Sequence, residues 1–107
     1  MIQCYKDIKG LDRHVQQKHM SYFFYILRCS DNTLYCGQTN DLERRIQEHN
    51  FDKNKSAKYL RGRTPAKLVY SEKYPTLQEA MRREAEIKRW PKVKKEALVK
   101  GKKTLLI

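Results

Sequence analysis

The chain has 107 residues, which suits one small domain, and its 24 Lys and Arg residues against 12 Asp and Glu residues give a net charge of +12. Such a basic excess favours a polyanionic partner, nucleic acid first and an anionic membrane surface second, over a merely solubilising surface. No apolar run reaches the roughly 18 residues that a membrane span needs. We expect a cytoplasmic protein, most simply a monomer, with no membrane-spanning segment.

The domain boundaries follow from the composition at the two ends of the chain. Residues 1–20 are polar, without sustained periodicity and without the apolar core of a signal peptide. The first strong strand pattern begins directly after them. We expect a weakly ordered or tag-like N-terminal extension over residues 1–20, a folded domain over residues 21–101, and a short C-terminal tail over residues 102–107.

The three cysteines, Cys4, Cys29 and Cys36, are odd in number and have no CxxC spacing, which is typical of a reduced, cytosolic chain. Cys29 and Cys36 are expected to be neighbours across a hairpin, so a disulfide is the alternative in an oxidising environment. We predict buried thiols.

A hairpin is predicted at the start of the domain. Residues Tyr22–Arg28 are apolar on both faces, which indicates a strand in the middle of a sheet. Residues 30–32 (Ser-Asp-Asn) have turn chemistry, and a second strand returns over Thr33–Cys36 until Gly37 ends it.

The parity of the hairpin loop decides whether two tyrosines meet. A two-residue loop would turn Tyr25 and Tyr35 to opposite faces of the sheet, whereas an odd loop of three residues places Tyr35 opposite Leu27. The two tyrosines then share a face. A functional site that uses both tyrosines requires the odd loop.

A helix is predicted to follow, with Asn40 as its N-cap and Asn50 near its end. Arg44 and Glu48 are expected on its outer face. The side that packs is expected to carry apolar and functional residues alike: Leu42, Arg45, Ile46 and His49.

The segment after this helix, residues 51–65, is a basic loop in which Ser56–Leu60 has the pattern of a short helical turn. A flexible solvated loop is the plain interpretation. Basic residues interleaved with an aromatic ring are also typical of a surface that follows phosphates and stacks on bases. The residues expected to bind nucleic acid in this way are Lys53, Lys55, Lys58, Tyr59, Arg61 and Arg63.

The remaining elements are a third strand over Ala66–Tyr70, extending as far as Glu72, and two helices. The first helix is capped by Thr76 and is expected to end near Arg89. Its inward stripe is predicted to be Leu77, Ala80, Met81, Glu84 and Ile87. A carboxylate among apolar residues needs a partner, a metal or a catalytic role, so Glu84 is a candidate site residue.

The last helix is expected to open at Pro91 and to end at Gly101, since proline suits a first turn and glycine a helix end. Its inward residues are predicted to be Val93, Ala97 and Leu98.

These side chains suit phosphodiester hydrolysis. The guanidinium of Arg45 can hold a phosphate through two parallel hydrogen bonds, and Glu84 can hold one divalent cation of the Mg²⁺ type. Tyr25 or Tyr35 can orient or deprotonate water, and His49 can act as acid or base near neutral pH. Each residue taken alone is more often structural, so the combination carries the hypothesis.

Four features occur at fixed spacing: Phe23-Phe24-Tyr25, then Tyr35-Cys36-Gly37, then Arg45, then Glu84. In this pattern the sequence from residue 21 to residue 100 resembles the GIY-YIG nuclease superfamily, and within it the small stand-alone bacterial YhbQ-like (UPF0213-type) group. The resemblance implies an α/β (α+β) domain with a small three-stranded antiparallel sheet flanked by helices, the GIY-YIG endonuclease fold.

The resemblance also implies roles for these residues. Tyr25 and Tyr35 would be the tyrosines of the two motif halves, Arg45 the catalytic arginine and Glu84 the single ligand of Mg²⁺ or Mn²⁺. His49 stands where larger relatives carry a His or a Tyr.

The sequence departs from the family pattern in three places. The first motif half is Phe-Phe-Tyr in place of Gly-Ile-Tyr, and Cys36 replaces an Ile. Gln38 stands where DNA-repair relatives carry a phosphate-binding Lys, and it is included among the residues expected to bind nucleic acid.

The first functional hypothesis is therefore a metal-dependent DNA endonuclease, directed by DNA structure or backbone and acting in repair or recombination. The rival is a nucleic-acid-binding domain or repair adaptor with little or no catalysis, and RNA is the alternative substrate. A membrane-surface role lacks the amphipathic helix that it would need.

Overall fold

A computed structural model describes the backbone of residues 21–105 and the side chains of residues 21–101. The extension expected over residues 1–20 lies outside the described residues. Among the helices described, none is long and apolar enough to cross a membrane.

The centre of the fold is a three-stranded antiparallel sheet in the order β2-β1-β3. Its strands are β1 (Tyr22–Arg28), β2 (Leu34–Thr39) and β3 (Lys67–Tyr74). The central position of β1 confirms the prediction made from its two apolar faces. β3 continues past Glu72, where the predicted strand ended, because it pairs with β1 as far as Tyr22.

The hairpin between β1 and β2 has the odd loop that the site requires. The backbone N–H of Cys29 donates to Thr33 O at 2.8 Å, and that of Asn32 donates to Cys29 O at 2.9 Å. Asn32 has φ 70°, a left-handed conformation that asparagine tolerates better than most residues. Leu27 therefore pairs with Tyr35, which is the odd-loop alternative of the two considered.

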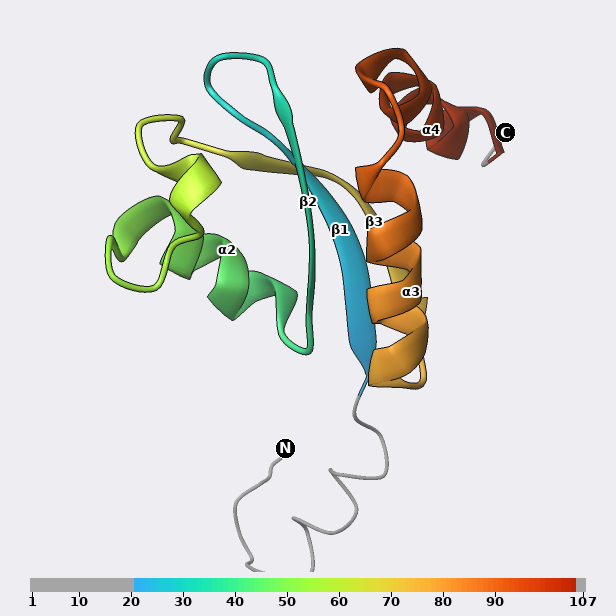
Figure 1. The fold of residues 1–107 in the computed structure, drawn as a ribbon, viewed down its shortest axis with the longest axis horizontal. Helices are drawn as coiled ribbons and strands as arrows, with labels where there is room; N and C mark the ends of the chain where they lie inside the picture. Colours follow the sequence, from blue (N-terminus) through green and yellow to red (C-terminus); the bar gives the residue numbers. More distant parts are fainter. Residues whose placement is uncertain (1–20, 106–107) are drawn as a thin grey trace, which may run out of the picture.

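Helices cover both faces of the sheet (Figure 1). One face packs against α3 (Leu77–Lys88) and α4 (Lys92–Leu105), and the other against α2 (Leu42–Phe51) and the short 3-10 helix η1 (Lys58–Leu60). This sandwiching explains why β1 is apolar on both sides. The first core consists of Phe24, Ile26, Leu34, Cys36, Ile87 and Val99, and the second of Tyr25, Leu27, Cys29, Leu60 and Ala66.

Cys29 and Cys36 are both buried free thiols, as predicted.

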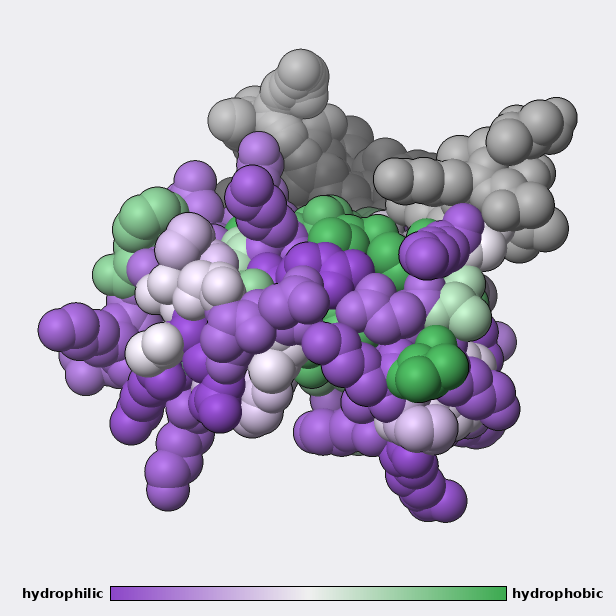
Figure 2. Space-filling view, turned by 90° about the horizontal axis from the view of Figure 1, so that it is seen from above, coloured by the Kyte–Doolittle hydropathy of each residue, from purple (hydrophilic) through white to green (hydrophobic). Residues whose placement is uncertain are grey.

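The view from above is dominated by hydrophilic side chains, with apolar residues reaching the surface in small patches (Figure 2).

Two helix-end predictions were wrong. The N-cap of α2 is Asp41 and not Asn40, because the Asp41 carboxylate accepts the backbone N–H of Arg44 at 3.1 Å. The last helix continues through Gly101 to Leu105. In contrast, Thr76 caps α3 as predicted, with Glu79 N–H donating to its hydroxyl at 3.3 Å.

The predicted inward stripe of α4 was also partly wrong. Val93 is 82% exposed and Ala97 is exposed as well, whereas Val99 is buried and Leu98 half-buried. A bidentate ion pair between Arg28 and Glu96, at 2.8 and 2.7 Å, fixes the rotation of the helix and turns Val93 outward. On α3, Ala80 and Ile87 are buried as expected, whereas Leu77 and Met81 are exposed.

A polar network ties β3 to α3. The Glu72 carboxylate accepts from Arg83 Nε at 2.9 Å and Nη2 at 3.0 Å, and from the hydroxyls of Tyr70 and Tyr74. Burial by itself raises the pKa of Glu72, but the bonds from Arg83 and the two tyrosines outweigh it and leave that pKa below its usual value.

We expect Glu72→Gln to lower the free energy of unfolding at pH 7 by about 2 kcal/mol, because it removes a charged acceptor from four donors. Since the folded-state pKa of Glu72 is depressed, its contribution is present above the unfolded pKa of about 4.3 and is lost as the pH falls through the folded pKa. Urea unfolding measured from pH 7 to pH 2 should show that the free energy of unfolding falls less steeply with decreasing pH in the variant than in wild type.

The matched control is Glu86→Gln. Glu86 also pairs with Arg83, at 3.1 Å, but is exposed, so the free energy of unfolding should change by less than about 0.5 kcal/mol. Equal effects of the two substitutions would contradict the special role of Glu72.

Candidate active site

The candidate active site lies along β2, the strand at the open edge of the sheet, between α2 on one side and α3 on the other (Figure 1). A hollow of about 490 Å³ opens beside this strand. Its lining comes from β1, from β2 and the turn after it, from α2 and from the start of α3: Tyr22, Gln38, Thr39, Asn40, Arg44, Arg45, Glu48 and Leu77.

Tyr25 and His49 form a buried pair beneath this edge. Their exposed fractions are 1% and 2%, and Tyr25 Oη lies 2.9 Å from His49 Nε2. The backbone N–H of Ala57 donates to His49 Nδ1 at 3.3 Å. Because that N–H can only donate, Nδ1 is unprotonated, and neutral His49 carries its proton on Nε2. His49 therefore donates to Tyr25, whose own O–H proton is left to donate elsewhere.

Both members of this pair are neutral at physiological pH. Burial, reinforced by the positive charge of Arg45, lowers the pKa of His49 to about 4. Burial also raises the pKa of Tyr25 well above its usual value, and neighbouring Tyr35 adds to the rise. The pair thus presents a phenol and not a phenolate.

Gly37 is the reason the Tyr25 ring can lie where it does. Gly37 pairs with Tyr25 across the two strands, and a Cβ on Gly37 would lie 2.5 Å from Tyr25 Oη and 2.6 Å from Cζ. The phenol therefore passes over the glycine to reach His49. In the order Tyr35-Cys36-Gly37 on β2, the tyrosine and the glycine lie two residues apart on the same face, so the glycine leaves room beside the Tyr35 side chain.

We expect Gly37→Ala to destabilise the fold by about 1–3 kcal/mol, because the Tyr25 ring is buried and fixed and cannot move aside freely. Urea unfolding measures the change. Gly101→Ala is the control, since nothing lies within 4 Å of its added Cβ in the interior of α4, and it should stabilise the protein by up to about 1 kcal/mol. If Gly101→Ala destabilised the protein more than Gly37→Ala does, the close contact between Gly37 and the Tyr25 ring would not be the cause.

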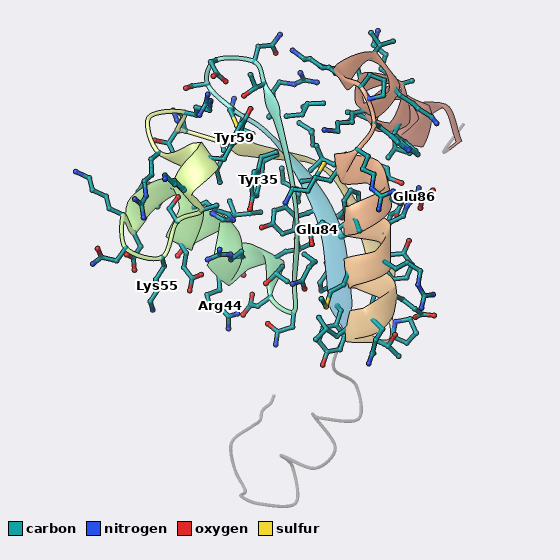
Figure 3. The ribbon with its side chains drawn as sticks, viewed as in Figure 1. Tyr35, Arg44, Lys55, Tyr59, Glu84 and Glu86 are labelled. Carbon is teal, nitrogen blue, oxygen red and sulfur yellow. The ribbon has the colours of Figure 1, made fainter. Side chains whose placement is uncertain are left out.

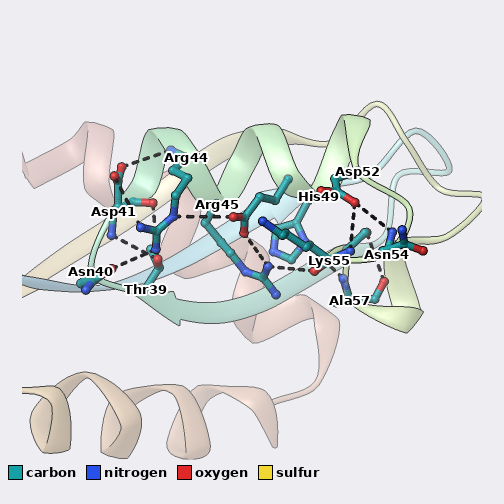
Figure 4. A network of polar contacts seen from close by, with 12 residues as sticks. Thr39, Asn40, Asp41, Arg44, Arg45, His49, Asp52, Asn54, Lys55 and Ala57 are labelled. Carbon is teal, nitrogen blue, oxygen red and sulfur yellow. Dashed lines mark hydrogen bonds and ion pairs between the residues drawn. The ribbon is translucent and has the colours of Figure 1, made fainter.

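Arg45 is held in place by its own helix and by the following loop (Figure 4). Its Nη1 donates to Glu48 Oε1 at 2.8 Å and to the carbonyl of Lys55 at 2.8 Å. Both bonds use Nη1, so Nε and Nη2 supply the guanidinium's remaining donors. At 28% exposure the side chain reaches solvent in the hollow. An anion in the hollow can therefore meet a preoriented guanidinium.

Tyr35 extends the aromatic cluster outward. Its ring centroid lies 6.4 Å from that of Tyr25, 5.5 Å from that of His49 and 5.9 Å from that of Tyr59, on which it stacks. The guanidinium of Arg63 lies over the Tyr59 ring, with its Cζ 4.2 Å from the ring centroid. The cluster therefore runs from the buried Tyr25–His49 pair to the surface.

Glu84 approaches from the opposite helix. Figure 3 shows its side chain on the side of α3 that faces the strands, whereas Glu86 points away from them. Glu84 is 23% exposed and its ion-pair partner is Lys88, at 3.7 Å. Burial chiefly raises the pKa of Tyr35, and the nearby Glu84 carboxylate adds to that rise.

A metal at this site would depend on few protein ligands. Within residues 21–101 no group of three or more His, Cys, Asp or Glu side chains is placed to hold an ion. A single half-buried carboxylate fits Mg²⁺, which keeps several of its waters and binds through one or two carboxylates. The chemistry of Glu84 is compatible with the Mg²⁺ or Mn²⁺ expected from the sequence.

The predicted catalytic residues thus divide into two groups across β2. Tyr25, Tyr35, Arg45 and His49 lie together on the α2 face, and Glu84 stands on α3. Gln38 joins Arg45 in the hollow. The basic residues that follow α2 lie in the loop after it and, for Lys58, on η1: Lys53, Lys55, Lys58, Arg61 and Arg63.

Sequence reasoning missed Glu48, which it placed on the outer face of α2. Glu48 holds Arg45 at 2.8 Å and also lies 3.6 Å from Arg44. The i,i+3 and i,i+4 spacing of these residues was the available signal.

Comparison with known proteins adds a family assignment to this geometry. Residues 21–97 match the GIY-YIG catalytic domain family. A UPF0213 protein of the archaeon Natronomonas pharaonis is 49% identical over 78 residues, which cover 73% of this chain and 89% of that protein. A UPF0213 protein of Staphylococcus aureus is 45% identical over 80 residues, covering 75% of this chain and 95% of the relative.

A solved structure was also found. The solution NMR structure of a UPF0213 protein from Bacillus halodurans is 46% identical, with a TM-score of 0.49, and covers 76% of this chain and 84% of the other. The matched region of the family, residues 21–97, includes every candidate catalytic residue from Tyr25 to Glu84.

Proposed function

Since this chain belongs to the GIY-YIG catalytic domain family, we propose that it is a divalent-metal-dependent endonuclease that hydrolyses phosphodiester bonds of DNA. The observation that carries the proposal is the solvent-facing guanidinium of Arg45 beside the Tyr25–His49 pair, with the Glu84 carboxylate across β2. The net charge of +12 supports a polyanionic substrate.

In this proposal Arg45 binds the scissile phosphate. Two parallel N–H donors match two phosphate oxygens, and the guanidinium stays charged at every working pH. Its anchorage to Glu48 and Lys55 lowers the cost of ordering it when the substrate arrives.

Glu84 would hold the metal ion, which supplies Lewis-acid stabilisation of charge on the phosphate and leaving oxygens. The protein's own contribution would be the Glu84 carboxylate on the side of α3 that faces the strands, so that a metal there and the Arg45 guanidinium would bring positive charge to the phosphate from two sides.

Tyr25 acts in this scheme as a neutral hydrogen-bond donor. Its raised pKa makes it a poor base, and because His49 already donates to its oxygen, its own proton would be available to a phosphate oxygen held by Arg45. His49 is then a positioning residue that orients the phenol. Tyr35 borders the same site and can orient the attacking water.

Substrate selection would follow backbone or structure. The hollow offers two guanidinium groups, two amides and the hydroxyl of Thr39, which suit contacts to the sugar–phosphate backbone. Such an enzyme suits repair or recombination intermediates.

A second candidate function is nucleic-acid binding without turnover. Arg45 already has a carboxylate partner in Glu48, and Gln38 in the hollow offers no charge. Both features would weaken the hold on a phosphate relative to a free guanidinium flanked by a lysine.

Cleavage assays with metal distinguish the two functions. Nicked, branched, duplex and single-stranded DNA are incubated with the protein in Mg²⁺, Mn²⁺ or EDTA. Cutting with metal and none in EDTA is expected. Retention of DNA on a gel without cutting of any substrate would overturn the enzyme and favour the binder. Binding that ignores salt between 50 and about 200 mM would contradict nucleic-acid binding altogether.

A further inference from the structure

A second hollow, of about 430 Å³, lies at the C-terminal end of α2, between the helix and the loop that follows it. Its floor includes Leu60, which is fully buried, and His49, whose other side meets Tyr25. Its rim carries Phe51, Lys53 and Arg61. The floor is thus shared with the candidate active site, and the rim is aromatic and basic.

Phe51 is the unusual residue of this rim. It is 85% exposed, the largest exposed fraction of any large apolar side chain among the residues described. Since a phenylalanine with this exposure contributes little to the core, its ring is available to a ligand. A flat aromatic ring beside an apolar floor suits a flat ligand that stacks.

The walls of the hollow are fixed before any ligand binds. The Asn50 amide accepts from Ala66 N–H at 2.8 Å and donates to Ala66 O at 3.0 Å, which joins the end of α2 to the start of β3. Asp52 accepts the backbone N–H groups of Asn54 and Lys55 at 3.0 and 3.2 Å. A preformed site of this kind loses less entropy when it is filled.

The charge around the hollow selects an anionic ligand. Within residues 21–101 the side chains of Lys53 and Arg61 make no hydrogen bond or ion pair, so both are available to phosphates. An aromatic ring for a base together with cations for its phosphates is the combination found in single-strand-binding surfaces.

We propose that this hollow binds one unpaired nucleobase of the substrate strand, stacked on Phe51, while Lys53 and Arg61 hold the adjoining phosphates. The proposal rests on the proposed function, because it places a strand of the nuclease substrate here. Phe51 lies six residues after Arg45 on α2, about 9 Å along the helix axis, so the base would lie a few nucleotides from the phosphate at Arg45. The substrate must therefore contain a single-stranded segment next to the cut.

The test uses the full chain in EDTA, so that binding is measured without cutting. Fluorescence anisotropy gives the affinities of wild type, Phe51→Ala and Phe51→Trp for a single-stranded 12-nucleotide DNA, the same RNA and the DNA duplex. Phe51→Ala should weaken single-strand binding about tenfold and duplex binding less than twofold, and Phe51→Trp should retain single-strand binding. Val93→Ala, which removes an equally exposed apolar residue from α4, should change neither.

An abasic scan locates the base. One abasic nucleotide is moved along the single strand, and wild type should lose about tenfold in affinity at one position and little elsewhere. Phe51→Ala should show no loss at that position. A flat scan in wild type, or an equal loss for duplex and single strand in Phe51→Ala, would overturn the proposal. The scan measures binding alone and does not depend on catalysis. If the protein cut no substrate but showed the expected position-specific loss, the proposed nuclease activity would be wrong and the base-binding site would still be supported. Comparison of the DNA and RNA strands shows which sugar the site accepts.

Discussion

Replacing Arg45 with alanine is expected to lower the rate of metal-dependent cleavage about 1,000-fold, which corresponds to about 4 kcal/mol of transition-state stabilisation. Negative charge grows on the phosphate oxygens as the attack proceeds, and the guanidinium would stabilise that charge more than the charge of the bound ground state. The affinity for uncut DNA in EDTA should therefore fall by less than about tenfold. Single-turnover cleavage and anisotropy measure the two quantities separately.

Arg44→Ala is the matched control for this variant. Arg44 is the preceding residue and carries the same charge, and it borders the same hollow, but it is 56% exposed and pairs with Asp41 and Glu48 on the helix surface. The rate should stay within about threefold of wild type. If the cleavage rates of the two variants fell equally, a general loss of positive charge would explain the effect, and a specific role of Arg45 would be contradicted.

Glu48→Gln adds a test of how Arg45 is held. Two contacts fix the guanidinium, and only one of them, from Glu48, is a side chain. The backbone carbonyl of Lys55 remains in the variant, so the rate should fall far less than in Arg45→Ala, by about tenfold or less. A loss as large as that of Arg45→Ala would mean that Glu48 itself takes part in the reaction.

The meeting of the two tyrosines could be predicted from sequence because it depends on a strict periodicity. Side chains alternate along a strand, so the parity of one loop decides whether Tyr25 and Tyr35 share a face. Turn chemistry at residues 30–32 was compatible with an odd loop but left the two-residue alternative open, and the left-handed φ of Asn32 shows how the three-residue turn is accommodated. Local rules reduced the question to this one alternative, and the structure decides it in favour of the odd loop.

The state of His49 could not be predicted in the same way. Helical spacing placed His49 beside Arg45, but its tautomer depends on the N–H of Ala57, in a loop eight residues away. Its lowered pKa depends on burial beneath that loop. The sequence suggested an acid or base near neutral pH, whereas the contacts support a neutral residue that positions Tyr25.

The errors in α4 have a similar origin. Periodicity allowed more than one inward face for this helix, and a long-range ion pair between Arg28 and Glu96, 68 residues apart, selects among them. Likewise, Asn40 and Asp41 are both good caps by composition, and the carboxylate of Asp41 forms the bond to Arg44 N–H. Local propensity leaves such choices open, and tertiary contacts decide them.

Replacing Glu84 with glutamine is expected to reduce cleavage at 1 mM Mg²⁺ by about 100-fold or more, because the neutral amide is a far weaker ligand for a hard cation than a carboxylate. The loss should depend on metal concentration, since weaker binding moves the rate curve to higher Mg²⁺ without removing Arg45 or the Tyr25–His49 pair. Cleavage rates measured over a Mg²⁺ series would show this as a midpoint raised about 100-fold or more.

Glu86→Gln separates this effect from a general change in charge on α3. Glu86 lies two residues further along the helix, is 55% exposed, pairs with Arg83 and points away from the strands (Figure 3). Its replacement removes the same charge from the same helix, and both the rate and the Mg²⁺ midpoint should stay within about twofold of wild type. If Glu84→Gln left the midpoint unchanged and lowered only the maximal rate, the carboxylate would act on the reaction without holding the metal. Because Glu84 stands on a different helix from Arg45, across the edge strand, a raised midpoint would also mean that the two sides of β2 act on one substrate.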